Sequence, residues 1–425
     1  MLDLNYLREN LDAAVAGLSK RNIPNAKDLL QELIEIDDKR KSTQFQLDEH
    51  LAKSNRLSKE IGDLFKSGQK EQAEVLRQET ADLKESAKLL QEQQAEVLQE
   101  LEDKLLQIPN IPHSSVPAGK TPEENEVVRK WGDFPTLAAD NELAHWELAK
   151  KYRIFDLELG VKLTGGGFPV YIGKGAQLQR GLINFFLHKA SEAGFLEVIP
   201  PLLVNEASAR GTGQLPDKEG QMYEMKIDPY FLIPTAEVPI TNIYRDEVVE
   251  EASLPIKMAG YTPCFRREAG SYGAHVRGLN RLHQFDKVEI VQIAHPDKSY
   301  EILEEMVAHV ESLVQALELP YRVLRLCGGD MGFTSALTYD IEVYSAAQKR
   351  WLEVSSISNF ETFQANRLKL RYKDNEGKRA LAHTLNGSAL ALPRIVAAML
   401  ENHQEADGIR IPKAVQAFVG FDKLV

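Results

Sequence analysis

Two long stretches in the first quarter of the chain repeat their seam positions at alternating spacings of three and four residues. The seam positions are Leu33, Ile36, Arg40, Thr43, Leu47, His50, Ser54, Leu57, Ile61 and Leu64, followed by Ala73, Leu76, Thr80, Leu83, Ala87, Leu90, Gln94, Val97 and Leu101. A short turn, Ser67-Gly68-Gln69, separates the two stretches. Two long helices joined by such a turn run antiparallel, and a 3.5-residue period winds them into a coiled coil. We therefore predict a helical hairpin over about residues 27–105.

The seam of this hairpin contains several polar residues, and its surface is highly charged. Basic residues gather toward the tip among nearly as many acids, at Lys53, Arg56, Lys59, Lys66, Lys70, Arg77, Lys84 and Lys88. Heptad helices most often serve as dimerising coiled coils, whereas a basic tip is typical of a nucleic-acid-binding arm. An ordinary solvated helix face has a similar composition. The hairpin alone leaves these interpretations open.

A proline-rich segment follows the predicted hairpin. Pro109, Pro112 and Pro117 exclude a continued helix, and glycine and proline become common beyond them. We place the domain boundary here. The expected domains are an N-terminal domain over residues 1–108 and a second domain over residues 109–425.

The second predicted domain mixes strands and helices. β-Rich runs occur at residues 288–291 and 339–343, and helical patterns occur at residues 175–192 and 298–317. Strands do not alternate strictly with helices, and strand–loop–strand patterns are present. We therefore expect an α+β domain on a largely antiparallel sheet, not a doubly wound domain. The sequence contains neither GxxxxGK[ST] nor a GxGxxG after a strand, so the common phosphate loops are absent.

Composition restricts the function classes without selecting one. The 425 residues include 63 acidic and 51 basic residues, a net charge of −12, whereas nucleic-acid binders usually show a basic footprint. A local basic stripe can still attract a polyanion, so composition alone favours a small-molecule enzyme without excluding a nucleic-acid partner. The two cysteines, Cys264 and Cys327, suit a reducing compartment and offer no zinc ligand set. No apolar run approaches the roughly 20 residues of a membrane helix. The first residues lack a signal-peptide pattern, so we expect a cytoplasmic protein that makes no membrane contact.

The segment from Cys264 to Glu289 is the richest in candidate chemistry. We expect two strands joined by a glycine-containing loop, with Arg266 and Glu268 on one face of the first strand. Phe285, Lys287 and Glu289 would share a face of the second strand. A guanidinium suits a phosphoryl or carboxylate group, and an aromatic ring can stack on a base. A surface hairpin with cross-strand ion pairs is the alternative.

A second candidate segment begins at Asn386-Gly387-Ser388. Ser388 fits a helix N-cap, and the start of a helix favours anions. Arg394 would then lie near the helix start, where a basic residue opposes the helix dipole, so a negative group should be nearby. A surface arginine on an amphipathic helix is the alternative reading.

These segments together resemble a known enzyme class. Residues 264–289 and 386–396 are similar to motifs 2 and 3 of class II aminoacyl-tRNA synthetases, and residues 194–201 are similar to motif 1. The runs 211–216, 235–237, 329–333 and 353–356, with the opening hairpin, resemble the seryl branch of that class. The resemblance covers essentially the whole chain in the expected order.

The resemblance implies an ATP site and assigns its residues. By analogy, Arg266 holds the α-phosphate and the serine carboxylate, Phe285 stacks on the adenine, and Arg394 clamps the far phosphate. Glu268 would contact the adenine side, and Arg266, Arg394 and Asn386 would position the reactants. The implied ATP-contacting residues are Arg266, Arg267, Glu268, Leu282, Phe285, Glu353, Val354, Ser355, Ser356 and Arg394.

The resemblance also implies a Mg²⁺ site and a serine site. Glu353 and Ser356 would hold Mg²⁺, which prefers oxygen ligands, and no zinc is expected. Strict strand alternation would put these two residues on opposite faces, so we expect a bulge or a strand end there. Glu353 could instead be an edge-strand carboxylate, and Thr235 an ordinary strand residue. The implied serine-contacting residues are Thr235, Ala236, Glu237, Glu289 and Ser388.

The implied activity is that of a serine–tRNA ligase, with tRNA(Ser) bound through the hairpin arm. The resemblance further implies a homodimer formed through motif 1, and tRNA(Sec) as a second substrate. Gly167, Phe360 and Asn366 depart from the usual family residues, but none is assigned to serine or ATP. His275 and His283 are expected to be structural or close to tRNA.

Two other functions remain in view from the sequence. One is a synthetase-like ligase that loads an amino acid onto a carrier protein, although such relatives typically lack the arm and use zinc. The other is a non-enzymatic coiled-coil scaffold with a degenerate synthetase domain. Retention of Arg266, Glu268, Glu289, Glu353 and Arg394 argues against the scaffold.

Overall fold

The computed structural model spans residues 1–425 and describes all of them except 136, 138–141 and 269–275. The chain divides into two compact units. One comprises Leu2–Ser19 and Ile23–Pro109, and the other comprises Met1, Lys20–Asn22 and Asn110–Val425. The first unit is helical, and the second contains the sheets.

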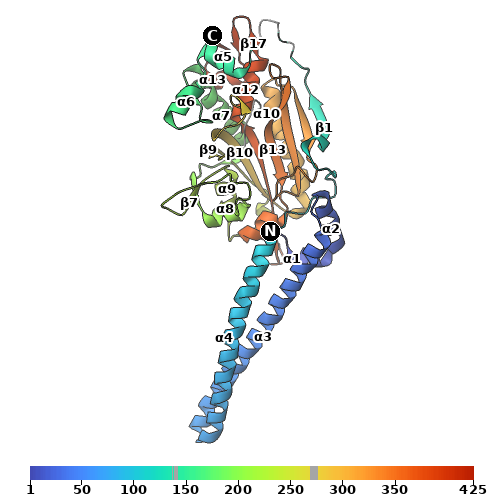
Figure 1. Ribbon diagram of the computed structural model, residues 1–425, viewed down its shortest axis with the longest axis vertical. Coiled ribbons are helices and arrows are strands. Elements are labelled where there is room, and N and C mark those ends of the chain that lie inside the picture. Colours follow the sequence, from blue (N-terminus) through green and yellow to red (C-terminus); the bar gives the residue numbers. More distant parts are fainter. Residues whose placement is uncertain (136, 138–141, 269–275) are drawn as a thin grey trace. The chain divides into compact units, whose positions relative to one another are not determined.

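Two long helices, α3 (Ala26–Lys66) and α4 (Lys70–Leu105), form an antiparallel hairpin in the first unit (Figure 1). They follow two short helices, α1 (Leu4–Glu9) and α2 (Leu11–Lys20). The turn between the long helices contains Gly68 at φ +81°, a left-handed conformation that glycine adopts without strain. The predicted hairpin is therefore confirmed, and we call residues 26–105 the arm.

The seam of the arm is the one that the spacing predicts. Every predicted seam position, from Leu33 to Leu64 and from Ala73 to Leu101, is buried or half-buried. Polar side chains are buried among the apolar ones at Thr43, Ser54, Thr80 and Gln94. Gln94 Nε2 donates to Gln44 Oε1 at 3.1 Å across the seam. The seam is therefore specific in register but poor in apolar contacts.

One aspartate at the base of the arm is surrounded by cations. Asp37 on α3 is 1% exposed and accepts from Arg8 Nη2 of α1 at 2.7 Å and from Arg40 Nε at 2.8 Å. Lys41 Nζ lies 3.1 Å from the same carboxylate. Burial raises the pKa of Asp37, but the hydrogen bonds from these three residues outweigh it and lower the pKa to about 2. The cluster fastens α1 to α3.

The second unit is built on a mixed sheet that has eight strands among the described residues. Its strand order is β1-β11-β12-β13-β16-β10-β9-β4. The bounds are β1 Glu126–Trp131, β11 Tyr321–Arg325, β12 Leu337–Ser345, β13 Arg350–Asn359, β16 His383–Ala391, β10 Gln284–Ala294, β9 Ile256–Phe265 and β4 Leu196–Glu197. Neighbouring strands in this described sheet pair antiparallel, except that β4 lies parallel to β9. The expected α+β fold with a largely antiparallel sheet is confirmed.

Helices cover both faces of this sheet. Val288 and Ile290 of β10 belong to the large core that also contains residues of α7 (Lys174–Glu192), α10 (Ser299–Ala316) and α12 (Leu392–Asn402). Val291 and Ile293 point to the opposite face, because side chains alternate along a strand. There they pack with residues of α9 (Glu237–Thr241) and α11 (Thr362–Leu368). We call this second face, which also carries Glu289, the front face.

Shorter elements complete the second unit. The remaining helices are α5 His145–Tyr152, α6 Leu157–Leu163, α8 Glu206–Thr212 and α13 Lys413–Val419. The remaining strands are β2 Phe155–Asp156, β3 Val170–Tyr171, β5 Leu203–Asn205, β6 Tyr223–Glu224, β7 Tyr230–Leu232, β8 Val248–Glu250, β14 Arg371–Lys373, β15 Arg379–Leu381, β17 Gln404–Glu405, β18 Gly408–Arg410 and β19 Lys423–Leu424. Among the described residues, no helix combines the length and the apolar character needed to cross a membrane.

Two local expectations are wrong. Ser388 is not a helix N-cap, because β16 continues to Ala391 and α12 begins only at Leu392 with Ala391 as its N-cap. Arg266 and Glu268 do not share a strand face either, since β9 ends at Phe265 and Glu268 adopts φ +48°. Pairing with β10 and β13 extends β16 beyond what its Asn-Gly-Ser sequence suggests.

Candidate active site

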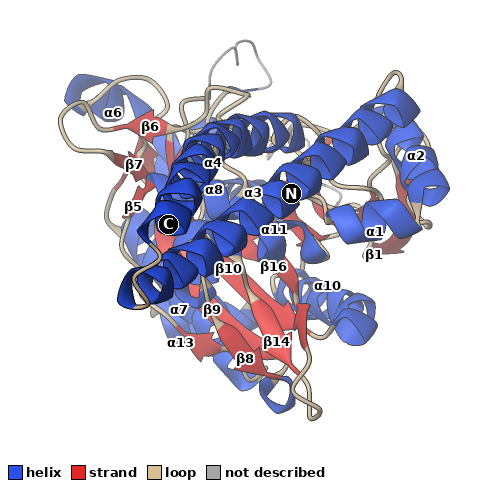
Figure 2. Cartoon of the chain, turned by 90° about the horizontal axis from the view of Figure 1, so that it is seen from below, coloured by secondary structure: helices blue, strands red, loops and turns tan. Residues whose placement is uncertain are grey.

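The centre of the site is a pair of side chains on neighbouring strands. Glu289 of β10 is directly opposite Ser388 of β16, and the two strands run side by side (Figure 2). Residues opposite each other in a sheet point to the same face, so both side chains lie on the front face. Both are buried. Strand pairing therefore brings together two of the residues predicted to contact serine.

Thr235 joins this pair from the segment that leads into α9. Its Oγ1 donates to Glu289 Oε2 at 3.2 Å and accepts from Lys287 Nζ at 2.8 Å. Lys287 Nζ also lies 2.5 Å from Glu289 Oε2. Lys287 and Glu289 are two residues apart on β10, so they share a face, as expected. Lys287 is nonetheless a residue that the predicted serine set omits, although it supplies the positive charge next to Glu289.

Glu237 is the second buried carboxylate of the cluster. It is the first residue of α9, after the buried N-cap Ala236, and its Oε1 accepts from Gln364 Nε2 at 2.6 Å. Asn386 of β16 also hydrogen-bonds to it. Burial, and then the charge of Glu289, raise the pKa of Glu237 to about 7 against the lowering effect of these contacts. Gln364 is a further neighbour that the sequence reasoning missed.

Arg266 leaves the end of β9 beside the ring of Phe285. Its guanidinium carbon lies 5.3 Å from the Phe285 ring centroid, within the range of a cation–π contact. Its backbone N–H donates to His283 O at 2.9 Å, and its Nε approaches Pro234 O at 3.4 Å. The guanidinium is thus held near both the aromatic ring and the segment that carries Thr235.

Arg267 and Glu268 do not continue the strand that the sequence predicts, because β9 ends at Phe265. Arg267 N donates to Gln221 O at 2.9 Å, and Glu268 N donates to Gln221 Oε1 at 3.1 Å. The Glu268 carboxylate forms an ion pair with Arg281. Leu282, another predicted ATP contact, is buried. The loop glycines Gly270 and Gly273, together with His275, lie outside the described residues.

Arg394 is in the first turn of α12, as the sequence suggests. Its Nε donates to Asn280 O at 3.0 Å and its Nη1 donates to Glu353 O at 2.8 Å. The Glu353 carboxylate lies 3.6 Å from Nη1 and is the expected negative neighbour. Arg266 and Arg394 therefore both hold the short segment 280–283, one through His283 O and the other through Asn280 O.

The predicted bulge is present in β13. Ile341 of β12 is opposite Ser355, but its neighbour Glu342 is opposite Glu353, so Val354 is the extra residue. As a result Glu353 and Ser356 point to the same face. Val354 joins the large core, and Ser355 Oγ donates to Ser388 O at 2.6 Å. The bulge lets one strand place two polar side chains on the front face while its core contact is kept.

The residues around this bulge fit a hard cation. Asp340 is opposite Ser356, and its Oδ1 is buried without a hydrogen-bond partner among the described residues. Burial, and then the charge of Glu353, raise the pKa of Asp340 well above its usual value. Two carboxylates and a hydroxyl are oxygen ligands of the kind that Mg²⁺ accepts while keeping some of its waters. The described residues contain no metal-binding group of three or more His, Cys, Asp or Glu side chains.

The residues that depart from the resembled family have local packing partners. His283 N donates to Gly167 O at 2.9 Å, and a Cβ at Gly167 would lie 2.5 Å from His283 Cδ2. His283 Nδ1 contacts Tyr223 Oη at 2.7 Å, which indicates a structural role for this histidine. Phe360 is buried, and Asn366 Nδ2 donates to Met1 O at 3.1 Å.

The antiparallel sheet and the polar residues on its front face define the class II aminoacyl-tRNA synthetase core. The family model described as the tRNA synthetase class II core domain (G, H, P, S and T) matches residues 223–403. The model described as the seryl-tRNA synthetase N-terminal domain matches residues 1–112.

Comparison with individual relatives identifies the branch of this class to which the chain belongs. The serine–tRNA ligase of Salinibacter ruber is 50% identical over 426 residues, which cover 100% of this chain and 99% of the relative. The serine–tRNA ligase of Methylacidiphilum infernorum is 47% identical, over 98% of this chain and 99% of the relative. The structure of seryl-tRNA synthetase from Pyrococcus horikoshii complexed with ATP is similar with a TM-score of 0.90 and 32% identity, covering 100% of this chain and 99% of that one. The chain belongs to the serine–tRNA ligase family.

Proposed function

We propose that the chain activates serine with ATP to form seryl-adenylate and then transfers the seryl group to the 3′ end of tRNA(Ser). One observation carries the proposal. The front face of a class II synthetase sheet brings together Thr235, Glu289 and Ser388. The buried carboxylate of Glu237 is close enough for the charge of Glu289 to raise its pKa. Membership of the serine–tRNA ligase family supports the same substrates.

Serine would bind by its ammonium group and its hydroxyl. The carboxylates of Glu237 and Glu289 suit the ammonium group, while Thr235 and Ser388 add hydroxyl partners beside them. A buried polar site of this kind discriminates strongly against alanine, because an analogue without the hydroxyl leaves buried polar groups unpaired. Threonine would be excluded by steric fit instead.

Activation would proceed by in-line attack. A carboxylate oxygen of serine forms the bond to the α-phosphorus of ATP, the bond to the bridging oxygen breaks, and pyrophosphate leaves with that electron pair. Arg266 would hold the α-phosphate and the serine carboxylate together, while Phe285 stacks on the adenine. The step needs no protein nucleophile, since positioning and charge neutralisation supply the catalysis. The tRNA 3′-terminal hydroxyl then attacks the acyl carbon and AMP leaves.

The remaining ATP contacts would align the triphosphate. Arg394 would clamp the far phosphate, and Arg267, Glu268 and Leu282 would lie around the adenine. Asn386, through its hydrogen bond to Glu237, would hold the serine-binding carboxylate. Glu353, Ser356 and the neighbouring Asp340 would hold Mg²⁺, which neutralises phosphate charge when bound. Val354 and Ser355 would contribute through the backbone, since both side chains are buried.

The proposed partners follow from the family. The arm would bind tRNA(Ser), and also tRNA(Sec) where that tRNA is made, in the cytoplasm. Two chains would pair through motif 1. The exposure of Leu196 at 66% and Ile199 at 87%, both within that motif, supports such a contact. The expected domains, residues 1–108 for tRNA and 109–425 for catalysis, stay part of this proposal.

The test is ATP–pyrophosphate exchange by the purified chain. We expect exchange that depends on serine, and a loss of at least about 100-fold for Arg266→Ala, because an arginine on the reacting phosphate stabilises the transition state. Arg210→Ala, at an exposed arginine paired with Glu206, is the control and should exchange like the wild type. Exchange with threonine or proline but not with serine would refute the substrate assignment.

A further inference from the structure

Two backbone carbonyls set the orientation of Arg394. One belongs to Glu353 in β13, so strand pairing fixes its position. The other belongs to Asn280, in the turn that precedes β10, and no sheet hydrogen bonds hold that residue. The orientation of a long, flexible arginine side chain depends on how firmly its hydrogen-bond acceptors are held. The Asn280 carbonyl must therefore be held by contacts from elsewhere.

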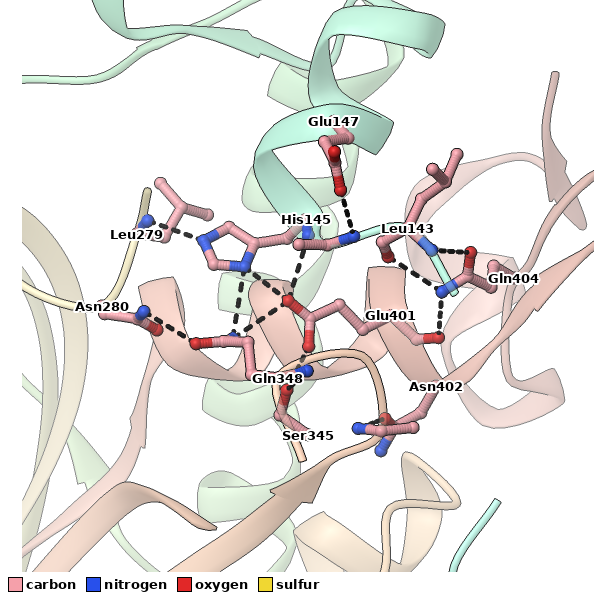
Figure 3. A network of polar contacts seen from close by, with 12 residues as sticks. Leu143, His145, Glu147, Leu279, Asn280, Ser345, Gln348, Glu401, Asn402 and Gln404 are labelled. Atoms are coloured by element: carbon pink, nitrogen blue, oxygen red, sulfur yellow. Dashed lines mark hydrogen bonds and ion pairs between the residues drawn. The ribbon is translucent and has the colours of Figure 1, made fainter. Parts of the chain in front are cut away.

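A buried carboxylate two turns further along α12 is the centre of those contacts. Glu401 is 0% exposed and accepts four hydrogen bonds (Figure 3). Its Oε1 accepts from His145 N at 3.0 Å, from His145 Nδ1 at 2.6 Å and from Gln348 Nε2 at 3.0 Å. Its Oε2 accepts from Ser345 Oγ. Four donors occupy the acceptor sites of the two carboxylate oxygens, so the network fixes the orientation of the Glu401 side chain.

The groups bound to Glu401 reach the turn that contains Asn280. His145 Nε2 accepts from Leu279 N at 2.9 Å, so the ring proton is on Nδ1, which donates to Glu401. Gln348 Oε1 accepts from Asn280 Nδ2 at 2.9 Å. Figure 3 shows His145 and Gln348 as the two bridges between Glu401 and residues 279–280.

The close approach of this turn to His145 requires a glycine. A Cβ at Gly278 would lie 2.1 Å from His145 Nε2, and Gly278 adopts φ +71°. Both facts exclude ordinary side chains at this position. The turn is therefore built against the Glu401 network along three consecutive residues, 278–280.

We propose that Gln348 is a positioning residue for Arg394 and, through it, for the triphosphate of ATP. Gln348 holds the Asn280 side chain, Asn280 presents its carbonyl to Arg394 Nε, and Arg394 faces the phosphates. The inference rests on the proposed function, because that function assigns the far phosphate of ATP to Arg394. Gln348 lies in the turn between β12 and β13 and belongs to none of the segments by which the sequence resembles the synthetases.

A merely structural role for the network makes a different prediction. If the hydrogen bonds only join α5 to α12, their loss lowers stability and weakens every ligand alike. If they orient Arg394, their loss weakens ligands that carry the far phosphates and spares those that do not. ATP and AMP separate the two cases, since they share the adenine, the ribose and one phosphate.

The experiment measures binding of Mg²⁺-ATP and of AMP by calorimetry to the full-length chain and its Gln348→Met variant. Methionine has a similar volume but neither donates to Glu401 nor accepts from Asn280. We expect ATP binding to weaken about tenfold, while AMP binding stays within about twofold. Arg394→Ala should show the same contrast, and the double variant should be no weaker than Arg394→Ala alone, because both changes remove one interaction.

Gln416→Met is the matched control. Gln416 Nε2 donates to Ile411 O at 2.9 Å, so the control also removes one glutamine hydrogen bond, but on α13, which carries none of the residues assigned to serine or ATP. It should bind both nucleotides like the wild type. If Gln348→Met does not fold, Asn280→Ala breaks the same bridge and should give the same contrast.

Equal losses for ATP and AMP, unchanged ATP binding, or additive losses in the double variant would each overturn the inference. The proposed function is tested separately by the wild-type exchange assay. A chain without serine-dependent exchange that still shows the ATP-specific effect would refute that function and leave the positioning role standing.

Discussion

Glu237 and Glu289 are two buried carboxylates that share one nearby cation. Lys287 Nζ lies 2.5 Å from Glu289 Oε2, whereas Glu237 is hydrogen-bonded by the neutral amides of Gln364 and Asn386. Burial and the charge of Glu289 therefore raise the pKa of Glu237 to about 7, and Lys287 offsets only part of this effect. One carboxyl group of the candidate serine site thus changes its charge near neutral pH.

We predict that the KM for serine falls as the pH rises through about 7. The ammonium group of serine binds an ionised Glu237, and below that pKa the carboxyl group must first lose a proton. The KM should therefore rise about tenfold for each pH unit below the pKa and be flat above it. Serine-dependent exchange at saturating ATP, measured from about pH 5.5 to 8.5, gives the profile.

Glu237→Gln supplies the control for this titration. The amide keeps the shape but cannot ionise, so the variant should bind serine weakly with a KM that no longer depends on pH in this range. The KM for ATP should show no matching inflection in the wild type. An inflection that persists in the glutamine variant would assign the titration to another group.

The bulge at Val354 leads to a second prediction, on Mg²⁺ dependence. Glu353→Gln replaces a charged oxygen ligand with a neutral one, so the Mg²⁺ concentration for half-maximal exchange should rise by about tenfold or more. The measurement is exchange at fixed ATP and serine over a Mg²⁺ titration. Saturating Mg²⁺ should restore much of the rate.

Glu342→Gln is the comparison variant for this titration. Glu342 is the carboxylate directly opposite Glu353, but Arg322 Nε already binds it at 2.5 Å. Its removal should leave the Mg²⁺ requirement unchanged. If both variants shift the requirement equally, the effect reflects the general negative charge of this strand pair and not a ligand at Glu353.

Local periodicity made the arm predictable. Helix geometry alone decides the direction in which each seam side chain points. The spacing from Leu33 to Leu101 therefore identifies the positions that are not exposed. The same holds for Lys287 and Glu289, which lie two residues apart on β10 and share a face, whereas Phe285 packs against the large core. The bulge was predictable because the proposed roles of Glu353 and Ser356 conflicted with strict alternation.

Pairing between distant segments was not predictable from spacing. Ser388 looks like an N-cap in its own sequence, but pairing with Glu289 keeps it in a strand. The local sequence predicts that Glu268 continues the strand, but the structure shows it in a left-handed backbone conformation, with its carboxylate paired to Arg281. The Glu401 network joins residues 145, 279, 348 and 401, which are far apart in the chain, and no short motif marks it. Nothing in the local sequence around His145 or Glu401 indicates that the two side chains are in contact.

A third prediction concerns the base of the arm. The pKa of Asp37 is lowered to about 2 from 3.8, so its ionised form stabilises the folded state above about pH 3.8, and this contribution is lost as the pH falls toward 2. Asp37→Asn should destabilise the arm by about 1–3 kcal/mol at neutral pH, since it removes charged hydrogen bonds from a buried site. Urea unfolding followed by circular dichroism should show a constant loss from about pH 5 to 8 that shrinks below about pH 4.

Asp38→Asn is the neighbouring control for Asp37. The Asp38 carboxylate also contacts Arg8, at 2.6 Å, but its side chain is 60% exposed, and exposed ion pairs contribute little. It should unfold like the wild type. Equal losses in the two variants would mean that the contact with Arg8, and not the burial of Asp37, determines stability.

The last prediction separates activation from transfer. The residues proposed to bind serine and ATP all belong to the second compact unit, whereas the arm belongs to the first. Gln44 and Gln94 are hydrogen-bonded across the seam at 3.1 Å, so a short Gly/Ser loop can join the helices just beyond them after removal of residues 46–92. The shortened chain keeps Asp37 and its three cationic partners, so the base of the arm stays intact.

We expect this shortened chain to exchange pyrophosphate within about twofold of the wild type, because distant changes act independently. Its kcat/KM for serylation of tRNA(Ser) should fall by at least about 100-fold, since the arm supplies nucleic-acid contacts. The control replaces the arm residues Lys104 and Glu32, which form an ion pair at 2.6 Å and lie outside the basic tip set, by glutamine and keeps the arm length. It should serylate with at most a modest loss. Serylation at the wild-type rate by the shortened chain would show that the arm does not bind tRNA. The arm would then be an ordinary coiled coil.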